Sequence, residues 1–174
     1  FHKYCNFNNQ ASIQKFLDYR RKYNVPLWLG ETGENSNTWF TNNIRLMEKN
    51  DIGWSWWQLK KMAINNPLEI KEPKNYQQFV DYCAGKNVTL SKPQAEQILN
   101  DLLQNIKIAN NLYHKDVIDA MFRQPYTTAT LPFKPNIISK KTFIKAVDYD
   151  LGRNGFAYND NDTASYMYTP GVHT

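Results

Sequence analysis

Four residues near the start of the chain have types and spacings that suit catalysis by an acid. The segment "VPLWLGETG" places Glu31 directly after an apolar run, and "FHKYCNF" places His2 and Tyr4 two positions apart. Residues two apart in a strand lie on the same face. "GWSWWQLKK" adds Trp57 near the end of a third apolar run. Glu31 is either a solvated strand-end acid or a catalytic group at the mouth of a barrel.

These residues need strands to position them, and the sequence predicts a parallel α/β arrangement over residues 1–62. A clipped apolar run at the start is followed by a helical pattern over residues 11–23. An extended run over residues 27–30 precedes a second helix, which carries Phe40, Ile44 and Met47, and a Trp-rich strand over residues 52–59. Alternating strands and helices of this kind are typical of parallel sheets.

The rest of the chain has a different pattern. Helices are expected over residues 76–82, 93–109 and 114–122, and Pro132 and Pro135 mark a linker. Asp, Gly, Asn and Tyr then separate short β-like pieces. We therefore expect a partial barrel domain at 1–64, a helical extension at 65–126, a linker at 127–141 and the start of a β-rich module at 142–174.

The three strand-end motifs together resemble the end of a glycoside hydrolase family five enzyme, in the group of endo-acting β-glucanases and cellulases. The resemblance covers residues 1–62 and implies the sixth, seventh and eighth strands of a (β/α)8 barrel. It implies that Glu31 is the nucleophile of a retaining mechanism, that Tyr4 hydrogen-bonds this carboxylate, and that His2 lines the same site. Trp57 matches the aromatic platform beneath the sugar.

Several assignments leave alternatives open. Lys60 or Lys61 matches a polar arm that reaches a neighbouring sugar hydroxyl, and the two are not separable by sequence. Glu34 is the competing acid, although its loop position suits a helix entry or a substrate contact better. We expect Trp54 and Trp56 to be structural, because buried Trp is the common case.

The resemblance also implies a missing part. A whole barrel takes about 250 residues, and this sequence supplies three of the eight strand-helix units, without the Asn-Glu pair of the acid/base strand. We expect the chain to be a piece of a longer protein, to need the N-terminal part of the same barrel, and to be inactive alone. The expected substrate is a β-1,4-glucan or related plant polysaccharide, with mannan, xyloglucan or non-catalytic sugar binding as the alternatives.

A second resemblance lies in "AVDYDLGRNGFAYNDNDTASY", which is similar to the opening strands of a family six carbohydrate-binding module, a β-sandwich. The family's calcium-binding acid is replaced by Val147. Asp160 and Asp162 lack the Gly and Glu of a helical calcium loop. We therefore predict neither a metal site nor a cofactor.

Composition excludes other classes. The net charge of +5 arises from 21 Lys and Arg against 16 Asp and Glu, spread along the chain rather than clustered as in nucleic-acid-binding proteins. The sequence contains no run of 18 apolar residues, so it does not predict a membrane span. Cys5 and Cys83 could pair or remain thiols. Because polymeric glucans lie outside cells, we expect a secreted, periplasmic or cell-surface protein.

Overall fold

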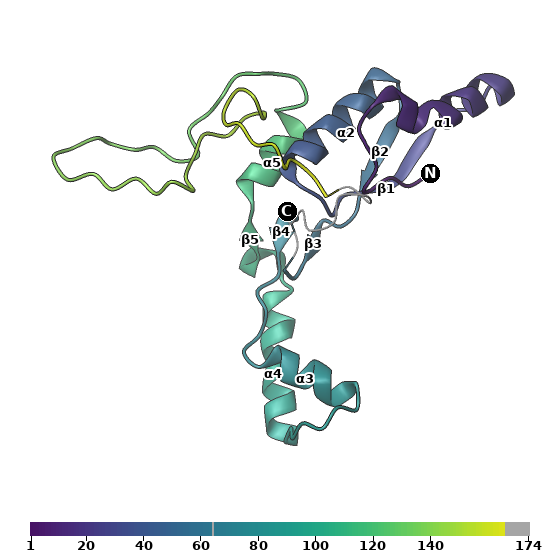
Figure 1. Cartoon of the computed structure of the whole chain (residues 1–174). Helices are drawn as coiled ribbons and strands as arrows, with labels where there is room; N and C mark the ends of the chain where they lie inside the picture. Colours follow the sequence, from purple (N-terminus) through teal and green to yellow (C-terminus); the bar gives the residue numbers. More distant parts are fainter. Residues whose placement is uncertain (64, 166–174) are drawn as a thin grey trace. The chain divides into compact units, whose positions relative to one another are not determined.

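The computed structural model describes residues 1–63 and 65–165, and the chain divides into two compact units (Figure 1). Unit 1 comprises Phe1–Gln58 and the residues from Lys115 onward, and unit 2 comprises Leu59–His114. The units are mixed in secondary structure, with helices and small sheets. Among the described residues, no helix combines the length and the apolar character needed to cross a membrane.

Unit 1 contains three neighbouring parallel strand segments. Residues 1–3 lie beside strand β1 (Trp28–Thr32), with a parallel bridge between His2 and Glu31. Backbone bonds fix this register: Gly30 N donates to the Phe1 carbonyl at 2.8 Å, and Lys3 N donates to the Glu31 carbonyl at 3.1 Å. Strand β2 (Gly53–Trp56) pairs in parallel with the other edge of β1. The carboxyl ends of all three segments therefore lie at one edge.

Two helices connect these segments, and each begins at a polar cap. Helix α1 (Gln10–Tyr23) begins after Asn9, whose side chain accepts a bond from Ser12 N, and it ends at Asn24 in the left-handed conformation. Helix α2 (Asn37–Lys49) begins after Ser36, whose side chain accepts from Trp39 N. The helices predicted over these regions are confirmed.

The core of unit 1 has two clusters, one on each side of α2. The first joins α1 to the strands, and its buried members are Ile13, Leu17, Leu29, Leu46, Met47 and Ile52. The second joins α2 to helix α5 (Lys115–Phe122), and its members are Trp39, Phe40, Ile44, Val117, Met121 and Ala164. Complete burial of large apolar side chains contributes about 1.5 to 3 kcal/mol each, so both helices are held mainly by packing.

Helix α5 is the helix of unit 1 that follows β2. It packs on α2 (Figure 1). Polar bonds reinforce the contact: the Thr41 hydroxyl donates to the Ala120 carbonyl at 2.9 Å, and the Asn37 amide donates to Asp116 at 2.9 Å. The sequence assigned this helix to an extension at 65–126, whereas in the structure unit 2 is an insertion between β2 and α5.

Unit 2 pairs three short strands in the order β3 (Lys60–Lys61), β4 (Leu68–Glu69) and β5 (Leu112–Tyr113). Between β4 and β5 lie helices α3 (Tyr76–Cys83) and α4 (Lys92–Asn105), followed by the 3-10 helix η1 (Ile108–Asn110). Ser91 and Gln94 form a capping box at the start of α4. Cys5 in unit 1 and Cys83 in unit 2 are both free thiols.

Residues 123–165 return to unit 1 with little regular structure. An antiparallel bridge joins Leu131 to Leu151, and a parallel bridge joins Asn154 to Tyr158. The described part of the expected β-rich module, residues 142–165, contains such isolated bridges rather than strands. The remainder of that module, residues 166–174, lies outside the described residues.

Candidate active site

The structure brings His2, Tyr4 and Glu31 together at the carboxyl edge of the parallel segments. The Tyr4 hydroxyl donates a hydrogen bond of 2.7 Å to Glu31 Oε2. His2 Nδ1 lies 3.2 Å from the same oxygen. Both contacts use Oε2 and neither uses Oε1. The Glu31 side chain is 32% exposed, so the carboxylate is anchored through one oxygen and still reachable by a solute.

Tyr4 is held as a neutral hydrogen-bond donor. Burial raises the pKa of its phenol, and the hydrogen bond to Glu31 and the negative charges of Glu31 and Glu34 raise it further. A phenol that keeps its proton donates to the ionised carboxylate, and such charge-assisted bonds are among the stronger ones in proteins.

The two glycines that flank Glu31 allow other groups to come close. A Cβ on Gly30 would lie 3.3 Å from His2 Nε2. Gly33 has a φ of +148°, and a Cβ there would lie 2.0 Å from the Trp57 carbonyl oxygen. Glycine is therefore required at position 33, because a side chain would collide with this backbone.

Trp57 follows strand β2 and lies beside the end of β1, the strand that carries Glu31. Its backbone N–H donates to the Thr32 carbonyl at 2.8 Å, and its side chain is 42% exposed. The peptide bond between Trp57 and Gln58 is cis. An exposed indole at this edge offers a flat apolar face to a ligand.

The other two tryptophans of this segment make structural contacts. The Trp56 ring meets Phe40 edge-to-face at a centroid distance of 4.5 Å, and Trp54 lies 6.3 Å from Trp56 in a similar arrangement. Trp54 Nε1 donates to Glu48 at 3.2 Å.

Lys60 and Lys61, the other expected substrate contacts, lie in unit 2 on strand β3. The Lys60 ammonium donates to the Ile106 carbonyl within that unit. Glu34 lies in the loop after β1 with a φ of 50°, in the left-handed region.

Lys3 and Asn35 hold the backbone around the candidate site in place. Sequence analysis did not predict a role for either residue. Lys3 is 5% exposed and donates to the Asn6 carbonyl at 3.0 Å and to Asn8 Oδ1 at 2.6 Å. Burial lowers its pKa to about 8, against a smaller opposing effect of Cys5. The alternation of side chains along residues 2–4 could have predicted this position, because it places Lys3 on the face opposite His2 and Tyr4.

Asn35 ties the site to a distant segment. The fully buried side chain donates to the carbonyl of Tyr4 at 3.2 Å and to that of Ser165 at 2.8 Å, and it accepts from Ser165 N at 3.0 Å. These bonds fix the backbone from which the Tyr4 phenol reaches Glu31.

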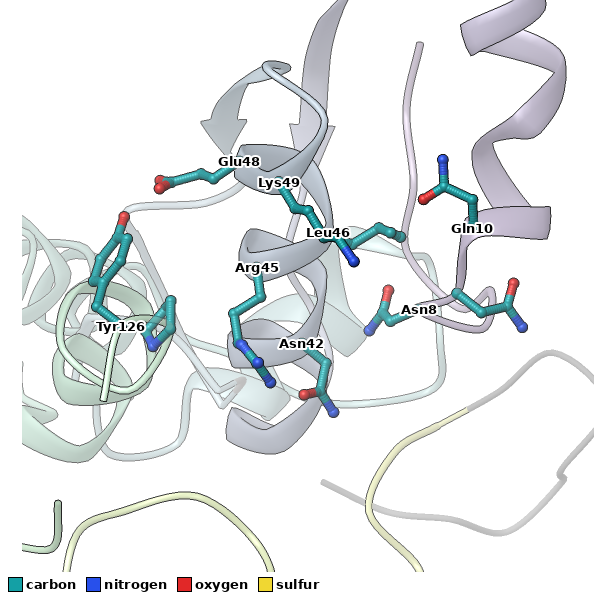
Figure 2. Close-up of a pocket in the computed structure, with 10 residues that line it drawn as sticks. Asn8, Gln10, Asn42, Arg45, Leu46, Glu48, Lys49 and Tyr126 are labelled. Carbon is teal, nitrogen blue, oxygen red and sulfur yellow. The ribbon is translucent and has the colours of Figure 1, made fainter. Parts of the chain in front are cut away.

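A hollow of about 510 Å³ lies elsewhere on unit 1, along α2 (Figure 2). Asn42, Arg45 and Glu48 reach it from α2, and the Tyr126 hydroxyl points toward the Glu48 carboxylate. The hydrogen bond to Glu48, with burial, raises the pKa of Tyr126 to about 12. None of the candidate catalytic residues lines this hollow, so volume alone does not locate the site.

Comparison with known proteins gave no relative: no family model, no curated protein and no solved structure matches the chain.

Proposed function

We propose that unit 1 is the nucleophile-bearing part of a retaining glycoside hydrolase that acts on a β-1,4-glucan or a related plant polysaccharide outside the cell. The observation that carries this proposal is the convergence of Tyr4 Oη and His2 Nδ1 on one oxygen of Glu31 at a strand-end edge. The resemblance of the three strand-end motifs to glycoside hydrolase family five supports the same assignment. The reaction needs no organic cofactor.

In this proposal, the free oxygen of Glu31 attacks the anomeric carbon of the sugar. The carbon–oxygen bond to Glu31 forms as the glycosidic bond breaks, and the leaving oxygen takes a proton from a second carboxyl group about 5 Å away. Water, deprotonated by that second group, then releases the sugar and restores the carboxylate. The second group belongs to strands outside these three units, so this chain acts only with them.

The surrounding residues would orient Glu31 and bind the sugar. Tyr4 and His2 hold Oε2 of Glu31. The rigid backbone of β1 sets the direction in which the other oxygen points. The exposed Trp57 indole would stack on the sugar at the cleaved bond. Lys60 or Lys61 stays the proposed contact to a neighbouring sugar hydroxyl.

The test compares Glu31→Gln with Glu34→Gln in the assembled protein, meaning this chain together with the strands that complete the barrel. Intact-mass analysis first establishes that assembly. We expect Glu31→Gln to lower the rate of reducing-sugar release from soluble β-glucan on the order of 10⁶-fold, as loss of the nucleophile of a serine protease does. Oligosaccharide binding, followed by tryptophan fluorescence, should survive. Glu34→Gln is the matched control and should retain most activity.

Other outcomes separate the alternatives. Equal activity of the wild type and Glu31→Gln would refute the nucleophile assignment. Sugar binding without any turnover in the assembled wild type would favour a non-catalytic carbohydrate-binding protein. Faster turnover of mannan or xyloglucan than of glucan would keep the mechanism and change the substrate.

A further inference from the structure

A second, smaller hollow in unit 1 is lined by two arginines from distant parts of the chain. It has a volume of about 210 Å³ and is bordered by α2, the residues after α5 and residues 153–163. Arg45 reaches it from α2 and Arg153 from the C-terminal segment. Thr41 and Gln124, 2% and 5% exposed, also line it. The site is thus built from three separate segments and has a polar, buried base.

The hollow has positive charge, and none of the described residues that line it is acidic. In the part of the chain that the structure describes, Arg45 makes no ion pair. The nearby Asp119 is already occupied, because it accepts from Arg123 at 2.5 and 2.7 Å and from Gln124 at 2.9 Å. Arg123 therefore has a counter-charge, whereas Arg45 and Arg153 have none among residues 1–63 and 65–165.

Arg153 is fixed in place by its own contacts. Its Nε donates to the Thr127 carbonyl at 2.8 Å, and its guanidinium lies 5.8 Å from the centre of the Phe156 ring. Burial and the positive charge of Arg45 lower the pKa of Arg153. Arginine nevertheless stays protonated in proteins, so two like charges face the same hollow at a cost in free energy.

We propose that this hollow binds a tetrahedral oxyanion, phosphate or sulfate, between Arg45 and Arg153. An anion would remove the repulsion, and guanidinium groups match the geometry of such oxygens. The volume favours a small ion, because it lies below the roughly 300 to 1,000 Å³ of pockets that enclose drug-sized ligands. The ion is either free or the ester group of a larger molecule. No residue of the candidate active site lines the hollow, so the site does not depend on the proposed hydrolase activity.

The test is calorimetric titration of the protein with sodium sulfate and sodium phosphate, with sodium chloride at equal ionic strength as the reference. We expect saturable binding that weakens at least about 10-fold in Arg45→Gln, because this variant loses the charge-assisted hydrogen bonds of one guanidinium to the anion. Arg21→Gln is the control: it removes the same charge from an exposed position, with a side chain 77% exposed, and should bind like the wild type.

Arg153→Lys provides an independent variant that keeps the charge at the site. It loses the forked geometry, and we expect an affinity between those of the wild type and Arg45→Gln. Circular dichroism checks that each variant is folded. Tighter binding of glucose 6-phosphate than of inorganic phosphate would assign the site to esters, and the reverse would assign it to free ions. Unchanged binding in Arg45→Gln, or an equal loss in Arg21→Gln, would overturn the proposal.

Discussion

Replacing Lys3 with methionine should remove a pH dependence of stability that the buried ammonium imposes on unit 1. Lys3 lies on the strand segment that presents His2 and Tyr4, and it is 5% exposed. Its ammonium is held by Asn6 and Asn8 and lies 4.8 Å from the centre of the Trp39 ring. These contacts offset part of the cost of removing a charge from water, but no carboxylate is among them.

The magnitude follows from the difference in pKa between the two states. Burial lowers the pKa of Lys3 from 10.5 to about 8 in the folded protein. Between these values the unfolded chain binds more protons than the folded one, so stability rises with pH. The penalty is about 3 kcal/mol at pH 7, and about 2 kcal/mol of it is recovered by pH 9.5.

The assay is urea unfolding at intervals from pH 7 to pH 9.5, with both proteins in a Cys5→Ser background because the Cys5 thiol opposes the shift. We expect the free energy of unfolding of the wild type to rise by about 2 kcal/mol relative to Lys3→Met across this window. The comparison cancels groups that titrate in both proteins. Parallel profiles for the two proteins would refute the inference that Lys3 is buried as a charge.

Three further results are expected. Tyr4 should stabilise the fold fully below pH 10, the pKa of an unfolded tyrosine, and this stabilisation should disappear as pH rises through the higher pKa of the folded protein. Tyr4→Phe should lack this contribution. Carbon NMR of labelled tyrosine measures the pKa of Tyr4, and a normal titration would contradict the prediction. Gly33→Ala should destabilise the protein by about 2 to 4 kcal/mol in urea unfolding, because its Cβ meets the Trp57 carbonyl, and a neutral effect would contradict the close approach. Ile44→Ala and Val117→Ala should each cost about 1 to 4 kcal/mol, with a coupling of about 0.5 kcal/mol or more in a double-mutant cycle, whereas simple additivity would argue against packing of α5 on α2.

Local signals were sufficient to predict the helices. Asn9 and Ser36 cap α1 and α2 through side-chain bonds to the first turn. Phe40, Ile44 and Met47, predicted as the apolar face of α2, are fully buried. Caps and helical spacing act within a few residues, so one sequence contains the information.

The packing partners were not predictable, because they depend on contacts between distant residues. The apolar positions Val117 and Met121 indicate that α5 has a buried face, but they do not say that α2 covers it. Nor does the spacing of His2 and Tyr4 reveal that Asn35 bonds the Tyr4 carbonyl, or that Ser165, 130 residues from Asn35, bonds Asn35 in turn. The site residues were grouped by resemblance, and the structure adds the distances between His2, Tyr4 and Glu31.

The position of unit 2 within the chain has a consequence for synthesis. A ribosome that has finished β2 must still make the 56 residues from Leu59 to His114 before α5 emerges. At 5 to 20 residues per second, this takes about 3 to 11 s. Throughout that time the face of α2 that carries Phe40 and Ile44 has no α5 to cover it. The nascent chain therefore passes through a delay in which an apolar helix face is open to chaperones and to neighbouring nascent chains.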